Sequence, residues 1–250
     1  MPLTYAIGDI HGRLDLLEAL LSAIGDDAGG RQARILFLGD IIDRGPDSRR
    51  CLDRVLATLD ELPGSRLILG NHEEFLLNFV DRPTERAAIA SRWLVNGGVA
   101  TLQSYGLDDG DGLDSLAAQL AEKAPAHLAG LRTADWMIET GSHVFVHAGI
   151  DPDLPLSGQQ PETTRWIRDR FLGFTGPLAK IVVHGHTITA SSRPEIHHNR
   201  IAIDTGAVHS GRLTCAVFDQ TAPPRFLATS DDDGAIEVGE IRPLQGHGRA

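Results

Sequence analysis

The sequence has few cysteines and no apolar run long enough to cross a bilayer. Cys51 and Cys215 are its only cysteines, which excludes a disulfide framework, and no C-x-x-C pair points to redox chemistry. The apolar stretches are far shorter than the roughly 20 residues of a membrane span. The N-terminus also lacks the basic and then apolar layout of a signal peptide. We therefore expect a cytoplasmic protein with no membrane partner.

Positive charge is also scarce. The chain of 250 residues has 23 Lys and Arg against 34 Asp and Glu, a net charge of −11. Such an excess of carboxylates repels polyanions, so we expect no nucleic-acid partner, and a phosphorylated substrate would need local cations to attract it. A content of 42% hydrophobic and 23% charged residues is that of an ordinary globular protein.

The first 80 residues repeat one pattern three times: a short apolar strand, a polar tip and a helix. The strands are expected at residues 3–7, 34–38 and 67–69, and each is followed by a glycine and a polar residue. The segments after them carry apolar residues at helical spacing. Alternation of strands and helices predicts a parallel sheet, which places its ligands at the carboxyl ends of the strands.

Residues 81–135 are predicted to be mostly helical, and we interpret them as an insertion packed over the site. Within this insertion, residues 93–98 are expected to be a plain helix end, because Asn-Gly-Gly is a strong C-terminal stop signal. The insertion is not expected to be a separate domain. We predict one domain over residues 1–242 and a disordered tail at 243–250, which shows no periodicity.

Strands return after residue 143. The last four are separated by short turns, and this spacing predicts an antiparallel second sheet. These four strands are expected near residues 181–183, 201–203, 214–218 and 225–228.

Five polar clusters follow the predicted strands. In each, an apolar strand ends at a side chain that carries oxygen or imidazole nitrogen, and a neighbouring glycine lets the backbone turn sharply. Mixed Asp, Asn and His donors suit Mn²⁺, Fe²⁺ or Zn²⁺, whereas a Ca²⁺ site would be nearly all oxygen. One such cluster is a common turn, but five in succession indicate a site, because partly buried polar groups cost free energy unless they find partners. The clusters are Gly8–Gly12, Gly39–Gly45, Gly70–Glu73, His147–Gly149 and His184–Thr187.

In chain order these clusters read GD-x-HG, GD-x-x-DRG, GNHE, HAG and GHT. The set spans residues 8–187 and resembles the calcineurin-like metallophosphoesterases, in particular the phosphoprotein phosphatase family and its bacterial serine/threonine phosphatase branch. The resemblance implies an α/β fold in which two mixed β-sheets pack as a sandwich flanked by helices. It also implies two divalent metal ions as cofactors, for which we expect Mn²⁺, with Fe or Zn as alternatives.

Carried over to this chain, the resemblance implies six metal ligands, with Asp40 bridging the two ions. The other ligands would be Asp9 and His11 for the first ion and Asn71, His147 and His186 for the second. A shared carboxylate offsets the repulsion between two dications, and neutral imidazoles keep the site Lewis-acidic. A water between the ions, ionised near neutral pH, would attack phosphorus in line with the leaving alcohol.

Three further residues would act on the phosphate and on the leaving group. Arg44 is the expected phosphate ligand, because its planar guanidinium suits phosphate and lies beside a metal-binding strand tip. His72 would protonate the leaving oxygen as a general acid, and Asp43 would orient its ring and raise its pKa. The alternatives are a surface ion pair for Arg44 and a helix cap for His72.

The remaining candidates are less specific. A second phosphate-binding arginine is usual in the family between its last two motifs. Arg165, Arg168 and Arg170 are eligible, and Arg168 is favoured because Trp-Ile-Arg resembles the bacterial segment. His184 would either support the ligands or be satisfied in the core. Asp204, in an Asp-Thr-Gly sequence after a predicted strand, resembles a family segment near the site but has no assignable role.

The resemblance leaves more than one function open. We expect a phosphatase that hydrolyses phosphate monoesters, with phosphoserine or phosphothreonine in proteins as the favoured substrate and a monomer as the favoured state. The alternatives are a broad small-molecule phosphomonoesterase and a symmetrical dinucleoside tetraphosphatase. Such tetraphosphatases typically lack the acid of the second motif and read GNHD in the third, whereas this chain has Asp43 and Glu73. A non-enzymatic scaffold would have lost ligands, and no ligand position is missing.

Overall fold

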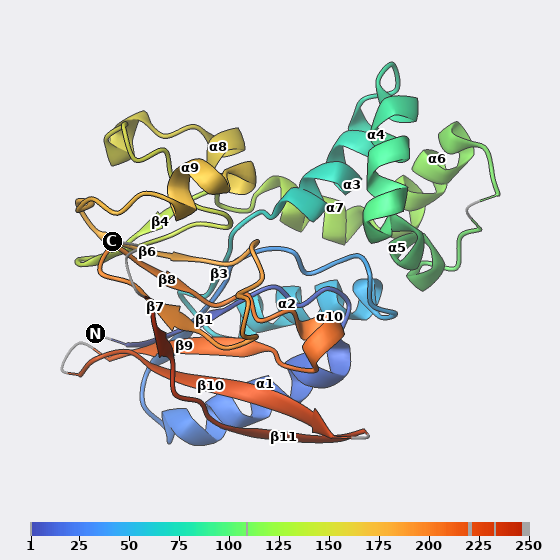
Figure 1. Ribbon diagram of the computed structural model, residues 1–250. Helices are drawn as coiled ribbons and strands as arrows, with labels where there is room; N and C mark the ends of the chain where they lie inside the picture. Colours follow the sequence, from blue (N-terminus) through green and yellow to red (C-terminus); the bar gives the residue numbers. More distant parts are fainter. Residues whose placement is uncertain (1, 109, 220–221, 233, 247–250) are drawn as a thin grey trace.

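The computed structural model describes residues 2–108, 110–219, 222–232 and 234–246. Their strands form two six-stranded mixed sheets, flanked by helices (Figure 1). The predicted α/β fold of two mixed sheets with helices is therefore confirmed. Within the described residues, no helix is both long enough and apolar enough to cross a membrane.

In the first sheet, three parallel strands adjoin three antiparallel ones. β1 (Leu3–Ile7) pairs in parallel with β2 (Ala33–Phe37), which pairs in parallel with β3 (Arg66–Leu67). On the other side of β1 the pairing is antiparallel. The order there is β9 (Thr214–Phe218), β10 (Arg225–Asp232) and β11 (Ala235–Glu240).

The second sheet also has a parallel centre. β5 (His143–Phe145), β6 (Ile181–His184) and β8 (Arg200–Ala202) pair in parallel. The antiparallel strands at the two sides are β4 (Ile138–Glu139), next to β5, and β7 (Glu195–Ile196), next to β8. A short parallel strand, β12 (Leu244–Gln245), pairs with β7 at the edge.

The prediction that the last four strands form one antiparallel sheet is wrong. β6 and β8 are parallel in the second sheet, whereas β9 and β10 lie in the first sheet beside β1. The physical reason is that all four strands are buried apolar runs, and the sequence of such a run does not indicate which sheet it joins.

The prediction of a disordered tail is wrong for its first residues. Leu244 donates its backbone N–H to the carbonyl of Pro194 at 2.8 Å, and Gly246 donates to Ile196 at 2.8 Å. Main-chain hydrogen bonds at a sheet edge need no apolar periodicity, so the sequence pattern gave no sign of β12. Residues 247–250 of the predicted tail lie outside the described residues.

The two sheets pack face to face because their central strands are apolar on both faces. Successive side chains of a strand point to opposite faces. In β1, Ala6 belongs to the apolar cluster between the sheets, while Tyr5 and Ile7 belong to the cluster under the helices. In β6, Val183 lies between the sheets and Val182 belongs to the outer cluster of the second sheet. The result is a layered core with helices outside each sheet.

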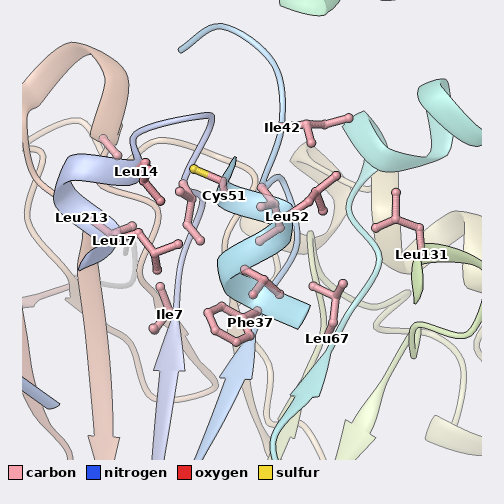
Figure 2. Packing of buried hydrophobic residues seen from close by; sticks show 14 of the residues in the cluster. Ile7, Leu14, Leu17, Phe37, Ile42, Cys51, Leu52, Leu67, Leu131 and Leu213 are labelled. Carbon is pink, nitrogen blue, oxygen red and sulfur yellow. The ribbon is translucent and has the colours of Figure 1, made fainter. Parts of the chain in front are cut away.

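Helices α1 (Leu14–Ala28) and α2 (Ser48–Glu61) cover the outer face of the first sheet. Figure 2 shows Leu17 and Leu52 from these helices packed above Ile7 and Phe37 of the sheet. The outer face of the second sheet is covered by the shorter helices α8 (Pro161–Trp166) and α9 (Asp169–Leu172) (Figure 1).

The region predicted to be mostly helical contains four helices that group with α3 (Asn71–Asp81) at one end of the molecule (Figure 1). They are α4 (Arg86–Trp93), α5 (Val99–Ser104), α6 (Leu113–Lys123) and α7 (Pro125–Arg132). The predicted helix end at residues 93–98 is confirmed. α4 ends at Trp93, the connecting turn η1 (Leu94–Gly98) is kinked at Gly97, which takes a non-helical φ of 111°, and α5 begins at Val99. The carbonyl of Gly97 accepts the N–H of Arg44 at 3.1 Å.

We expect Leu52→Ala to lower the free energy of unfolding by about 2–5 kcal/mol, because it removes packed apolar contacts and leaves a cavity. Leu52 is fully buried on the inner face of α2. Urea unfolding followed by circular dichroism measures the change. Leu154→Ala is the control, since Leu154 is 43% exposed. Equal losses in the two variants would contradict the assignment of this core.

Candidate metal centre

The predicted ligands lie together at the carboxyl ends of the parallel strands. Asp9 follows β1, Asp40 follows β2, and Asn71 begins α3 after a short connection from β3. From the second sheet, His147 follows β5 and His186 follows β6. All five side chains are buried, as is that of His11. Segments far apart in sequence thus bring their polar ends to one edge of the sandwich.

The backbone at this edge is strained. Six described residues other than glycine have a positive φ, and all but Ser192 belong to the predicted site. Left-handed conformations of such residues cost free energy and persist only where the surroundings enforce them. The five site residues are His11, Asp40, Asp43, Arg44 and His186.

Backbone carbonyl groups fix the tautomers of two histidines. Nδ1 of His11 lies 2.7 Å from the carbonyl oxygen of Ile42, and Nδ1 of His147 lies 2.7 Å from that of Leu38. A carbonyl oxygen only accepts, so each Nδ1 carries a proton and each neutral ring presents the lone pair of Nε2. Burial lowers the pKa of His11 to about 3 and also lowers that of His147, which keeps both rings neutral.

These lone pairs converge on the carboxylate of Asp40. Nε2 of His11 lies 3.6 Å from Asp40 Oδ2, and Nε2 of His147 lies 3.4 Å from Asp40 Oδ1. Nε2 of His147 is also 2.9 Å from Asn71 Oδ1 and 3.2 Å from His186 Nδ1. Asp40 therefore belongs to two groups of potential ligands, one with His11 and His72 and one with His147 and His186.

The donor set fits divalent cations. Nε2 of His147 faces the oxygens of Asn71 and Asp40, so lone pairs meet there, and a cation between them would turn this repulsion into attraction. Carbonyl groups that orient ligating histidines through their second nitrogen are common around metals. Nε2 of His186 is buried and has no hydrogen-bond partner among the described residues.

Asp9 faces the same cluster from β1. Both of its carboxylate oxygens accept the backbone N–H of His186, at 3.0 and 3.1 Å. A side chain at position 185 would collide with this carboxylate, which explains Gly185. Burial, together with the charges of Asp204 and Asp40, raises the pKa of Asp9 well above its usual range. An ionised Asp9 therefore needs positive charge nearby.

Glu73 has a structural role in the site that the sequence did not reveal. Its buried carboxylate accepts the backbone N–H groups of Asp40 and Ile41 at 2.8 Å, of Ile42 at 3.2 Å and of Gly70 at 3.0 Å. These bonds hold the loop after β2, in which Asp40 takes φ 51°. The bond to Gly70 caps the first turn of α3, but Gly70 has no side chain that could complete a capping box, so the sequence carries no such signature here.

Asp43 and His72 form a buried pair. Asp43 Oδ2 lies 2.6 Å from His72 Nδ1. Asp43 also accepts hydrogen bonds from Trp93 Nε1 at 2.9 Å and from Thr101 Oγ1 at 2.5 Å, so the helical insertion helps to hold it. Burial opposes the protonation of His72, but the charges of Asp40 and Asp43 raise its pKa overall. No local sequence pattern indicated that Trp93 and Thr101 would contact Asp43.

Arg44 lies between the two histidine rings. Its Nη1 donates to Nε2 of His11 at 2.7 Å, and its Nη2 lies 3.1 Å from Nε2 of His72. The surface ion pair considered for Arg44 does not occur among the described residues. The guanidinium instead faces the cluster of potential metal ligands.

The structure separates the three arginines of the 165–170 segment. Arg170 pairs with Asp151 and Asp153, and Arg165 pairs with Glu74. The side chain of Arg168 makes no hydrogen bond or ion pair within the described part of the chain. Its charge lowers the pKa of both His186 and Asp204, so it lies near the cluster.

His184 was expected either to support the metal ligands or to lie in the core, and the structure places it in the core. It is fully buried, and its ring packs edge-on against Phe171 of α9, with centroids 5.2 Å apart. Burial lowers its pKa to about 3. Only Gly185 separates it from His186 in sequence, yet its ring packs against the outer helix α9.

A two-sheet sandwich that gathers buried histidines and aspartates at one edge is the architecture of a metal-dependent hydrolase. More particularly, the chain belongs to the calcineurin-like phosphoesterases, because the sequence model of that family matches residues 3–190. Members of this family use divalent metals, and the protein is a hydrolase of this family.

Two curated relatives carry different activities. Serine/threonine-protein phosphatase 1 of Salmonella typhimurium is 30% identical over 226 residues, which cover 85% of this chain and 90% of the relative. A symmetrical bis(5'-nucleosyl)-tetraphosphatase of Cronobacter sakazakii is 27% identical over 93% of this chain and 98% of the relative. These relatives support the membership of the chain in the family, and their names give different substrates.

A solved structure supports the fold alone. The metallophosphoesterase from Sphaerobacter thermophilus superposes with a TM-score of 0.52 at 20% identity, over 96% of this chain and 89% of that one.

We expect Glu73→Gln to lower the free energy of unfolding by about 1–3 kcal/mol, because an amide nitrogen would face buried N–H groups that now have an acceptor. The urea midpoint of the purified protein measures this loss. Glu122→Gln, which changes an exposed carboxylate on α6, is the matched control. A midpoint for Glu73→Gln equal to that of the control would show that the loop does not depend on Glu73.

Proposed function

We propose that the protein is a phosphatase that hydrolyses phosphate monoesters, with phosphoserine and phosphothreonine of proteins as its substrates. The observation that carries this proposal is the Asp43–His72 pair beside the cluster around Asp40. An alkoxide is a poor leaving group, and a positioned general acid is what its departure requires. The pair supplies that acid at the edge where the potential metal ligands converge.

Two divalent ions would be held at this edge, with Asp40 between them. When bound, they would lower the pKa of a water to generate the nucleophile and would neutralise charge on the phosphoryl group. We propose Mn²⁺ for both, with Fe or Zn as alternatives, because the donors are mixed imidazole, amide and carboxylate groups. The proposed ligands are Asp9, His11 and Asp40 for one ion and Asp40, Asn71, His147 and His186 for the other.

The arginines would bind the phosphoryl oxygens. Arg44 already directs its guanidinium toward the cluster, and a bidentate guanidinium suits tetrahedral phosphate. Arg168 is the second proposed ligand, because its charge reaches His186 and its side chain has no partner within the described residues. Each arginine would offset negative charge that develops in the transition state.

His72 would carry the proton to the leaving oxygen. The bond from its Nδ1 to Asp43 orients the ring and leaves Nε2 toward the cluster. Without bound ions, the charges of Asp40 and Asp43 raise the pKa of His72, and in the metal-loaded protein Asp43 would stabilise the protonated ring against the charge of the cations. Trp93 and Thr101 would keep Asp43 in place while the proton moves.

A groove next to the cluster supports a polypeptide substrate. A cavity of about 1130 Å³ lies between α3, α4 and α8, and its lining includes Phe75, Arg92 and Trp166. Phe75 contacts the ring of His72, with centroids 6.3 Å apart, and Trp166 contacts that of His186 at 6.4 Å. The volume exceeds the roughly 300–1000 Å³ of ordinary small-molecule pockets. It can accommodate the residues that flank a phosphorylated side chain.

A symmetrical dinucleoside tetraphosphatase is the second candidate. Trp166 is 38% exposed and packs edge-on against Phe75, with centroids 5.3 Å apart, so its free face could stack on a nucleobase. The presence of Asp43 in the second motif and of Glu73 in the third argues for the phosphatase instead.

The assay that tests the proposal compares substrates on the purified protein with Mn²⁺. We expect turnover of a phosphoserine peptide and of 4-nitrophenyl phosphate, and loss of both with EDTA or in Asp40→Asn. No turnover above the Asp40→Asn variant would contradict the proposal. Diadenosine tetraphosphate is assayed beside the peptide, and a larger kcat/KM for the dinucleotide would select the second candidate.

We expect His72→Asn to lower kcat on a phosphoserine peptide by about 10²–10⁴-fold, since the leaving alkoxide would depart without a general acid. The loss on 4-nitrophenyl phosphate should be smaller, because nitrophenolate needs little protonation. Steady-state kinetics on both substrates and metal analysis of the variant provide the comparison. If His72→Asn also lost its bound metal, His72 would instead be a ligand.

A further inference from the structure

Asp204 lies at the same edge as the potential metal ligands. It follows β8, which pairs in parallel with β6, the strand that precedes His186. The N–H of Ile203 donates to the carbonyl of His184 at 3.0 Å. On the other side, a Cβ added to Gly8 would come within 2.6 Å of the Ile203 carbonyl oxygen. The residue after Ile203 therefore lies beside the residue after Gly8, which is Asp9.

The carboxylate of Asp204 is only partly satisfied by the protein. The side chain is 3% exposed. Oδ1 accepts the N–H of Gly206 at 2.9 Å, which closes a local turn before α10 (Ala207–Ser210). No described residue donates to Oδ2. A carboxylate on a side chain as buried as this one, with a single hydrogen bond from the protein, costs free energy unless positive charge lies nearby.

The charged groups around Asp204 are those of the proposed metal centre. The side chains of Asp9, Asp40 and Asp204 are all buried. Arg44 donates to the ring of His11 and faces that of His72, and within the described residues no arginine or lysine forms an ion pair with any of the three carboxylates. Buried carboxylates without such a partner favour a multivalent metal ion.

We propose that Asp204 supplies a further carboxylate to the metal centre, on the side of Asp9, and strengthens the binding of the divalent cation there. The inference rests on the proposed metal centre and adds a residue that the family motifs do not assign. Asp204 would therefore have two separate roles. Oδ1 accepts the hydrogen bond that closes the turn, whereas the negative charge of the carboxylate would attract the cation.

Two substitutions separate these roles. Asp204→Asn keeps an oxygen that can accept the N–H of Gly206 but removes the charge, whereas Asp204→Ala removes both. Asp60→Asn, which neutralises an exposed carboxylate, controls for net charge. Isothermal titration of the metal-free proteins with Mn²⁺ measures both sites. We expect Asp204→Asn to weaken one of two Mn²⁺ sites by about 10–100-fold, the usual loss for residues that support a metal ligand, and Asp60→Asn to leave both unchanged.

Unfolding in urea provides a second readout that does not depend on activity. In EDTA, Asp204→Asn should be as stable as the wild type or more stable, because one of three repelling carboxylates is gone. In Mn²⁺ it should be less stable, because the cation binds the native state more weakly. A loss of stability in EDTA equal to that in Mn²⁺ would show a purely structural role.

Wild-type Mn²⁺ affinities in Asp204→Asn would overturn the inference and leave the proposed function intact. A wild-type protein that hydrolyses phosphopeptides but binds no Mn²⁺ would overturn both this inference and the proposed metal. Retention of both sites in Asp204→Asn but loss of one in Asp204→Ala would assign the residue to the turn alone.

Discussion

The lone pairs gathered around the buried carboxylate of Asp40 are the constraint on which the rest of the site depends. Two carbonyl groups hold the protons of His11 and His147 away from this centre. Arg44 donates to Nε2 of His11, whereas Nε2 of His147 faces the oxygens of Asn71 and Asp40 without hydrogen between them. Such an arrangement costs free energy unless a cation occupies it. The loop of Asp40 is in turn held by Glu73, which accepts four backbone N–H groups.

The fold provides this centre by duplicating one arrangement. Three parallel strands of the first sheet and three of the second each end at polar side chains, and the sheets pack with those ends at one edge. Apolar side chains on both faces of the strands fix the sandwich, and the polar residues sit where each strand stops. The helical insertion adds the partners of Asp43, so the proposed acid depends on a part of the chain outside the sheets.

The sequence predicts much of this arrangement, because the potential ligands lie in short polar clusters that follow apolar strands and contain a glycine. The helical content of the insertion also follows from local spacing. The contacts of Asp43 with Trp93 and Thr101 could not be predicted, since they join residues 50 and 58 positions apart. The sheet that β9 joins and the edge pairing of β12 depend on backbone hydrogen bonds that leave no mark on side-chain periodicity. The contacts of Glu73 with the loop of Asp40 join residues more than 30 positions apart, and the proposed role of Asp204 also follows only from its neighbours in space.

The central claim is that Asp40 is shared by two cations at the edge of the sandwich. Anomalous X-ray diffraction from crystals of the active protein grown with Mn²⁺ tests it most directly. The account predicts two Mn²⁺ peaks that both contact Asp40, one on the side of His11 and the other on the side of His147. Active protein with a single peak, or with Mn²⁺ bound only away from Asp40, would contradict it.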